Sequence, residues 1–292
     1  MTRIEILKLV ILASVFLLVL AIGLHAKLRD CGTLLRRPGL LARSILSMNG
    51  VMLVFAIAVA ALFHINPAIK IALIALAVSP VPPIIPNRQK KAGGSEDFAI
   101  GLLAAGAALS IVVVPLSMAV VGWIFGRDLN VPLGKVASIV LLTMLVPLAI
   151  GVLVHQFAPA FATKIAHPIS VLATVLLVFT VLPILVVAAS AVWALIGSGM
   201  ILFLVMFSAI GLVSGHYLGG PNPADRTVLA IATAVRHPAV ALAIASINFP
   251  DQKAVPAVVL CHLIVGTMLV MLYAKWRTPI HWSIGGPTAT HA

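Results

Sequence analysis

Residues 79–86 read Ser79-Pro80-Val81-Pro82-Pro83-Ile84-Ile85-Pro86 and interrupt a long apolar stretch. Proline lacks a backbone N–H and its ring clashes with the preceding helical turn. Four prolines in seven positions therefore cannot lie in a continuous helix. A second apolar stretch is interrupted by Thr233-Ala234-Val235-Arg236-His237-Pro238. The two stretches predict two discontinuous helices, one in each half of the chain.

The composition around these interruptions is that of a membrane protein. Of the 292 residues, 62% are hydrophobic and 9% are charged, and the mean hydropathy is +1.20. Soluble domains are roughly 45–50% apolar and about 25% charged, and disordered chains need low hydrophobicity and high charge, so both classes are excluded. The net charge of +12 fits basic residues gathered in cytoplasmic loops. Nucleic acid is not an expected partner, because no basic stripe alternates with aromatic residues; the lipid bilayer is.

Apolar segments long enough to span a bilayer recur along the whole chain. A span needs about 20 apolar residues, and loop-forming residues separate nine candidates. We expect an all-α integral membrane protein with one transmembrane domain over residues 1–292. The first segment is expected to be retained, since Leu24-His25-Ala26 is a poor signal-peptide cleavage site. The segments are 4–26, 40–63, 67–86 with a continuation to 93, 95–125, 132–157, 167–190, 194–218, 224–249 and 254–275.

The positions of Lys and Arg predict the orientation. With the N-terminus outside, twelve of the 19 basic residues fall on the inner side and six on the outer side, and Arg236 is the remaining one. Basic residues favour the cytoplasmic side. We therefore expect a multi-pass protein of the cell (inner) membrane, with a short cytoplasmic tail at residues 276–292.

Two proline-interrupted segments in the two halves of a chain indicate a transporter binding site, where half-helix N-termini can point at an anion. Arg236 supports this interpretation, because a mid-membrane Arg costs roughly 2.5–3.5 kcal/mol and needs a cavity and a partner. The seven acidic residues all fall near segment ends or loops, so the partner is either carbonyls of the broken helices or a bound anion. Two alternatives are ordinary proline kinks in packing helices and an Arg236 that snorkels to the interface.

Other motifs indicate neither catalysis nor a metal site. No nucleophile–base pair marks an enzyme, and no cofactor is expected. Glycines at 211, 215 and 219 recur at four-residue spacing, which predicts close helix packing. Intramembrane carboxylates, the common device for coupling to protons or sodium, are not expected here. Three histidines lack metal-ligand spacing and carboxylate partners: His155, His216 and His262.

Four short motifs share an order and spacing with a known family. They are Leu34-Leu35-Arg36-Arg37-Pro38, Ser79-Pro80, Asp97-Phe98-Ala99-Ile100 and Ala241-Leu242-Ala243. The chain resembles the bile acid:sodium symporter family over about residues 15–275. The resemblance implies a core domain of two crossing discontinuous helices packed on a panel domain, with nine spans as in the family's shorter form. It also implies transport of an organic anion with two sodium ions, by an elevator-like movement of one domain.

The family's sodium ligands do not carry over to this chain. A hard cation needs several oxygen ligands. If a two-residue insertion before Asp97 is allowed, the family's ligand positions fall on Met48, Ile85, Pro86, Gly101, Ala105, Thr233, His237 and Pro238. Nearly every side-chain oxygen is lost, and Arg236 adds a positive charge beside one of these positions.

We therefore expect a secondary transporter that moves a small organic anion by alternating access, without sodium coupling. Arg236 would supply a fixed positive charge and His237 a pH-sensitive one, and cytoplasmic anions would be attracted by Arg88, Lys90 and Lys91. The candidate binding residues are Arg236, His237, Thr233, Pro238, Ser79, Pro80, Pro83, Asn87 and Asn49.

Other functions remain open. Sodium symport would need shifted ligands such as Asn49, Asn87 and Thr233. A non-transporting membrane receptor or binding protein could reuse the fold. An exporter of the related arsenite type is disfavoured, because Ser79 stands where that group has a cysteine.

Overall fold

The computed structural model describes residues 3–82, 92–129 and 131–277, and this part of the chain contains helices and no β-strand. Two short apolar helices, Leu9–Gly23 and Pro67–Val78, accompany seven helical segments that are long and apolar enough to cross a membrane. The protein is accordingly a multi-pass integral membrane protein. The seven segments are Pro38–Leu62, Glu96–Phe125, Leu133–Phe157, Pro159–Thr180, Met200–Leu218, Pro223–Asn248 and Val255–Arg277.

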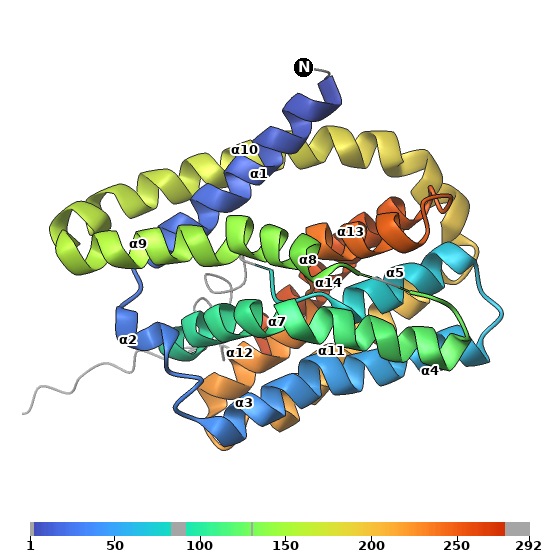
Figure 1. Ribbon diagram of the computed structural model, residues 1–292, viewed down its shortest axis with the longest axis horizontal. Helices are drawn as coiled ribbons and strands as arrows, with labels where there is room; N and C mark the ends of the chain where they lie inside the picture. The colour runs from blue at the N-terminus through green and yellow to red at the C-terminus, as the bar shows by residue number, and fades with distance from the viewer. Residues whose placement is uncertain (1–2, 83–91, 130, 278–292) are drawn as a thin grey trace, which may run out of the picture.

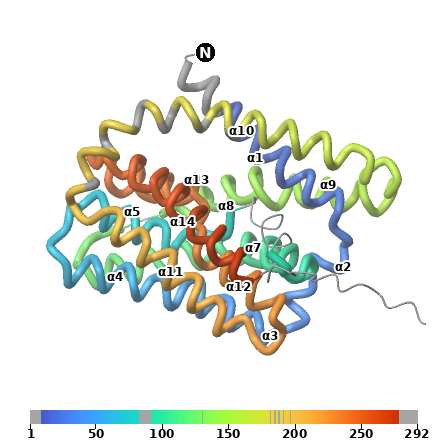
Figure 2. The backbone as a smooth tube through the Cα atoms, turned by 180° about the vertical axis from the view of Figure 1, so that it is seen from behind, coloured from blue at the N-terminus to red at the C-terminus, as the bar shows by residue number. Residues whose placement is uncertain are grey.

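One layer of the molecule is formed by helices near the N-terminus and the middle of the chain. Figures 1 and 2 both show α1, α9 and α10 lying together along one side of the molecule. The contact between α1 and α9 is very close, because a Cβ on Gly151 would lie 2.5 Å from the Leu20 carbonyl oxygen. The elements of this layer are α1 (Arg3–Gly23), α8 (Leu133–Val140), the π-helix η2 (Leu141–Leu145), α9 (Val146–Phe157) and α10 (Pro159–Ile196).

The remaining helices form the second layer, which contains both interruptions (Figure 1). A π-helix, η1 (Leu46–Val51), joins α3 (Pro38–Ile45) to α4 (Met52–Leu62) without a break in the helical path. The other elements are α2 (Leu28–Cys31), α5 (Pro67–Val78), α7 (Glu96–Phe125), α11 (Met200–Leu218), α12 (Pro223–Ala234), α13 (Pro238–Asn248) and α14 (Val255–Arg277).

Both predicted interruptions begin where the sequence places them. α5 ends at Val78, and residues 79–82 are non-helical; the continuation of this segment to residue 93 lies largely outside the described residues. α12 ends at Ala234 and α13 begins at Pro238, so three non-helical residues separate them. Proline at the first position of α5, α12 and α13 fits the helical φ angle and needs no N–H there.

The predicted segment 167–190 is too short, because α10 is helical over Pro159–Ile196. Pro159 occupies the first helical position, where proline is tolerated, and Pro168 and Pro183 lie inside the helix. The following predicted segment begins too early, at 194. The turn at Gly199, with φ +81°, ends the connection, and α11 starts at Met200.

The glycine motif brings α11 against α12, as its spacing predicted. A Cβ on Gly211 would lie 2.7 Å from Ala234 Cα, and one on Gly215 would lie 2.5 Å from Ala230 Cα. Only glycine permits such an approach between two helix backbones. The contact holds the C-terminal end of α12 firmly beside α11, next to the second interruption.

Candidate functional site

The two interruptions meet at Arg236, which is fully buried (0% exposed). Its Nε donates a hydrogen bond to the Leu76 carbonyl at 3.0 Å, and its Nη2 donates to the carbonyls of Ala77 and Met48. No carboxylate among the described residues pairs with the guanidinium, and Nη1 has no hydrogen-bond partner there. Backbone carbonyls are therefore partners of Arg236, and full burial excludes snorkelling to an interface.

The end of α5 explains why the carbonyls of Leu76 and Ala77 can accept from Arg236. The last four carbonyls of an α-helix have no partner within the helix, and α5 ends at Val78. Ser79 caps this end: its Oγ donates to the Leu76 carbonyl at 2.8 Å. The C-terminal end of a helix also carries partial negative charge, so the end of α5 attracts a buried guanidinium.

A backbone hydrogen bond joins the two interruptions directly. The N–H of His237 donates to the Pro80 carbonyl at 2.9 Å. Pro238 follows as the first residue of α13. The His237 side chain is 2% exposed, and its ring nitrogens have no hydrogen-bond partner among the described residues. His237 is thus placed by its backbone, and its imidazole remains unpaired within this part of the chain.

A chain of hydroxyl groups connects α12 to η1 and α11. Thr233 Oγ1 donates to the Leu229 carbonyl at 2.8 Å and lies 2.9 Å from Ser47 Oγ. Ser47 Oγ in turn lies 3.2 Å from Ser214 Oγ. Ser47 was not among the predicted site residues; Asn49 was selected because it adjoins Met48, a position that the family resemblance assigns to a cation ligand. In the structure Ser47 lies in the π-helix η1 and faces Thr233. π-Helices are frequent at functional sites, but nothing in residues 46–51 marks one in the sequence.

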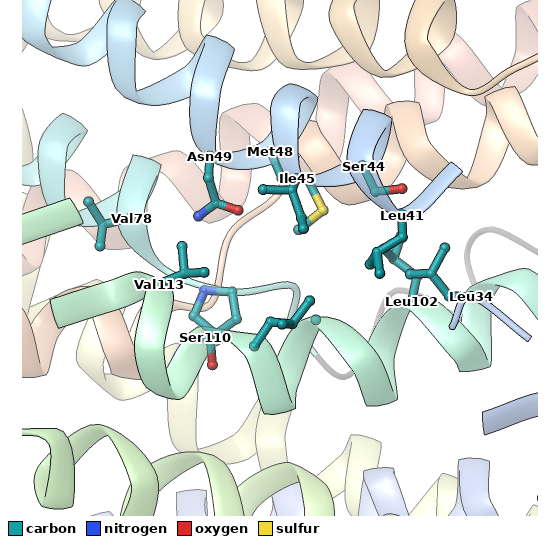
Figure 3. Close-up of a pocket in the computed structure, with 13 residues that line it drawn as sticks. Leu34, Leu41, Ser44, Ile45, Met48, Asn49, Val78, Leu102, Ser110 and Val113 are labelled. Carbon is teal, nitrogen blue, oxygen red and sulfur yellow. The ribbon is translucent and has the colours of Figure 1, made fainter. Parts of the chain in front are cut away.

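Asn49 lies on a different side of η1, in a cavity of about 30 Å³ between η1 and α7. Figure 3 shows Asn49, Met48 and Ile45 on one side and Val113 and Leu102 on the other. Pro80 also lines the cavity, so it borders the first interruption. The lining hydroxyls of Ser44 and Ser110 donate to carbonyls of their own helices. The side-chain amide of Asn49 therefore remains as a polar group that a molecule in this cavity could contact.

Two further buried polar side chains lie near the second interruption, and no sequence pattern singled out Ser208. Ser208 Oγ and His262 Cε1 lie 3.4 and 3.5 Å from the position that a Gly266 Cβ would occupy, and the Ala234 carbonyl oxygen lies 3.8 Å from it. Within the described residues neither Ser208 Oγ nor the His262 ring nitrogens have a hydrogen-bond partner. His262 is a histidine within an apolar run for which the sequence indicated no metal site. Its ring does pack edge-on against Phe207, with centroids 5.2 Å apart.

Basic residues cluster at the N-terminus of α12. Arg37 Nη1 lies 3.2 Å from the buried Asp225 Oδ2. Arg277 donates from Nε to Thr227 Oγ1 at 3.0 Å and from Nη2 to the Pro223 carbonyl at 2.9 Å. The starts of α3 and α12 and the end of α14 thus lie at one end of the molecule. The charge pattern assigned Arg37 and Arg277 to the same membrane side, which agrees with this arrangement.

The structure brings six of the nine candidate binding residues to the junction, and places Asn49 in the adjacent cavity. The six are Arg236, His237, Thr233, Pro238, Ser79 and Pro80. Pro83 and Asn87, together with the proposed anion-attracting residues Arg88, Lys90 and Lys91, lie outside the described residues.

A comparison with known protein families shows to which family the chain belongs. A model of the sodium bile acid symporter family matches residues 12–195, which is more than half of the chain. The chain belongs to the sodium bile acid symporter family. The matched stretch contains the first interruption, whereas Thr233, Arg236 and His237 lie beyond its end. A comparison with curated proteins gives no significant match.

Membership of the sodium bile acid symporter family makes this chain a transporter-like membrane protein. The positions that the family resemblance suggests for cation ligands can be compared with the geometry. Met48 contributes its carbonyl to Arg236 instead of a side-chain oxygen. Gly101 packs directly against the backbone of α2, since a Cβ there would lie 3.0 Å from the Asp30 carbonyl oxygen. Ala105 is buried and has no polar group. The described residues at these positions do not form a set of side-chain oxygens for sodium.

Proposed function

We propose that the protein is a secondary transporter that carries a small organic anion through alternating access without sodium coupling. The observation that carries the proposal is the fully buried Arg236 at the junction of the two interruptions. A cation there has no carboxylate partner among the described residues. A permanent positive charge beside a transporter's broken helices favours an anionic substrate.

The loss of side-chain oxygens supports sodium independence. Sodium symport would require several oxygen ligands to replace the ion's hydration shell. At the ligand positions suggested by the family resemblance, Met48, Gly101 and Ala105 offer no side-chain oxygen, and Thr233 Oγ1 already bonds Leu229 and Ser47. The guanidinium of Arg236 provides positive charge without any bound ion.

The proposed transport cycle uses two structural units. The second layer, with two crossing discontinuous helices, would act as the core, and α1, α8–α9 and α10 as the panel. We propose nine spans, of which α1 and the α5 segment are the two short ones, with the N-terminus outside and the C-terminus in the cytoplasm of the inner membrane. Movement of the core past the panel would expose the site alternately on the two sides.

Anion binding is assigned to groups at the junction. Arg236 Nη1 is the guanidinium nitrogen left without a protein partner in the described part of the chain. The unpaired His237 ring would add a second donor, and the Asn49 amide would bind polar atoms from the cavity side. Ser79, Thr233 and the prolines 80, 83 and 238 would shape the site. Asn87 would line it as well, and Arg88, Lys90 and Lys91 would attract anions from the cytoplasm.

Thermal unfolding of the detergent-purified protein tests this function. The melting temperature is compared in sodium and potassium chloride, with and without a panel of small organic anions. A ligand at 100 times its Kd adds about 2.7 kcal/mol of stability. We expect an anion that stabilises the protein equally in both salts, and then saturable flux of that anion into proteoliposomes without a sodium gradient.

Three outcomes would contradict the proposal. Stabilisation by sodium alone, or by anions only in sodium, would establish a sodium-coupled symporter with shifted ligands such as Asn49, Asn87 and Thr233. Saturable anion binding without flux would establish a membrane receptor. Equal anion binding by Arg236→Gln and the unmodified protein would remove Arg236 from the substrate site.

A further inference from the structure

The main-chain oxygens around Arg236 form a small cage at the centre of the second layer. The carbonyls of Leu76 and Ala77 come from the last turn of α5, and the carbonyl of Met48 comes from η1. All three accept hydrogen bonds from one guanidinium group. The cage therefore joins three elements that are far apart in the sequence: η1, α5 and the segment between α12 and α13.

The local structure explains why these carbonyls can accept from Arg236, although the Leu76 carbonyl also accepts from the N–H and Oγ of Ser79. Carbonyls in the last helical turn lack helix partners, and α5 ends at Val78. In η1 the π-helical register replaces the regular backbone hydrogen-bond pattern. These devices leave electronegative oxygens pointing at one buried position.

Converging carbonyl oxygens in a membrane protein are the ligands that monovalent cations use in place of water. Helix C-termini and unwound backbone carbonyls coordinate such ions in transporters. We propose that the carbonyls of Leu76, Ala77 and Met48 form a monovalent-cation site in which the guanidinium of Arg236 is the permanent occupant. The proposal rests on the sodium-independent function above and explains how that function is built: the cation is part of the chain.

The proposal predicts that removal of the Arg236 side chain opens a site for small free cations. Arg236→Ala would remove the guanidinium donor from all three carbonyls, of which Leu76 would keep its hydrogen bonds from Ser79, and it destabilises the junction because unsatisfied buried polar groups are costly. The guanidinium ion has the same hydrogen-bonding geometry as the lost group. We expect Arg236→Ala to have a lower melting temperature, and millimolar guanidinium chloride to restore at least half of the loss.

The experiment measures thermal unfolding in choline, sodium, potassium and guanidinium chloride at equal ionic strength. Choline is the reference, because it is too large for the cage. Arg226→Ala is the matched control: Arg226 Nε also donates to a backbone carbonyl, that of Gly220 at 2.6 Å, but this contact joins the first turn of α12 to the loop before it, away from the second interruption. We expect no stabilisation of Arg226→Ala or of the unmodified protein by guanidinium. A melting temperature of Arg236→Ala that is the same in all four salts would overturn the proposal.

Two further variants keep the test decisive if Arg236→Ala does not fold. Arg236→Lys keeps a cation in the cage, whereas Arg236→Met keeps the length and apolar contacts of the side chain without charge. We expect the melting temperature of Arg236→Lys to lie above that of Arg236→Met. The reverse order would show that Arg236 acts through packing alone and would overturn the cage.

The outcomes separate this inference from the proposed function. Sodium coupling is measured on the unmodified protein, in which the cage is filled. Cation binding by the three carbonyls is measured only on the Arg236 variants. Stabilisation of the unmodified protein by sodium would overturn the proposed function, while guanidinium rescue of Arg236→Ala would still establish the cation site.

Discussion

Arg236 is stabilised in the bilayer interior by dipoles instead of ions. A hydrogen bond to a charged group contributes about 1.5–3 kcal/mol, and the guanidinium makes three to main-chain carbonyls. Their sum exceeds the roughly 2.5–3.5 kcal/mol that insertion scales assign to a mid-membrane Arg. The sequence predicts that Arg236 needs a partner. It cannot choose between carbonyls and an anion, because that depends on where α5 ends relative to α12.

Thr233 provides a test of the hydroxyl chain at the same scale. Thr233→Val keeps the shape of the side chain but removes its hydrogen bonds to Leu229 and Ser47. Loss of a partner in a buried pair costs about 1–3 kcal/mol, so we expect a lower melting temperature in detergent. Thr233→Ser should recover most of the loss.

The control for this prediction is Thr163→Val. Thr163 is exposed, and its hydroxyl bonds only to the carbonyls of Pro159 and Ala160 in its own helix. We expect little change in its melting temperature. If the valine variants at 163 and 233 behave alike, the hydroxyl chain contributes no stability.

At the scale of the helix, proline and glycine carry most of the information that sequence provides. Proline clusters locate the ends of α5 and α12, and glycine spacing locates the contact between α11 and α12. The π-helices η1 and η2 could not be predicted, because their residues also fit an ordinary apolar helix. Asn49 was chosen for its place beside Met48 in the family resemblance, and no residue pattern indicates that Ser47 pairs with Thr233.

Gly215 is the sharpest test of an element contact. In Gly215→Ala the new Cβ would lie 2.5 Å from Ala230 Cα, a backbone atom that cannot move alone. Overpacking of this kind costs roughly 1–3 kcal/mol, so we expect a lower melting temperature and weaker expression. A loss of stability here should also separate α12 from α11 and disturb the Arg236 cage.

Gly134→Ala in α8 is the matched control, because nothing lies within 4 Å of a Cβ at that helical position. Alanine has a higher helix propensity than glycine, by up to about 1 kcal/mol, so this variant should be as stable as the unmodified protein or more so. Equal melting temperatures for the two alanine variants would disprove the close α11–α12 contact.

For the whole molecule, composition is enough to predict a multi-pass membrane protein, and charge distribution predicts its orientation. The layered arrangement is not readable from residue patterns, because every helix is apolar on most of its surface. The two-layer arrangement was expected from the family resemblance. Basic residues from distant segments, Arg37 and Arg277, do meet at the N-terminus of α12, as one common membrane side requires.

Cysteine labelling in whole cells tests the orientation. In a background with Cys31→Ser and Cys261→Ala, Lys253→Cys lies in the exposed connection between α13 and α14, and Pro221→Cys lies in the exposed connection between α11 and α12. We expect a membrane-impermeant maleimide to label Lys253→Cys in intact cells, and Pro221→Cys only after permeabilisation. The reverse pattern would place the N-terminus in the cytoplasm.

The native thiol in α2, which the unmodified protein retains, allows a separate labelling test. Burial raises the pKa of Cys31, and the nearby Asp30 carboxylate raises it further. The thiolate is the reactive form, so labelling of Cys31 should be slow at neutral pH and should increase as the pH approaches its raised pKa. Rapid labelling of Cys31 at neutral pH would contradict the half-buried position of α2.

The hydrogen bonds around Arg236 connect η1, α5 and α12–α13, and these elements all belong to the second layer. Sliding of this layer past α1, α9 and α10 would leave these bonds intact. The activation barrier of the proposed cycle would then come from the apolar contacts between the layers and from the surrounding lipid. Turnover should therefore vary with the fluidity of the bilayer, and the charge carried by the moving layer should differ between the empty and the loaded step only by the charge of the bound anion.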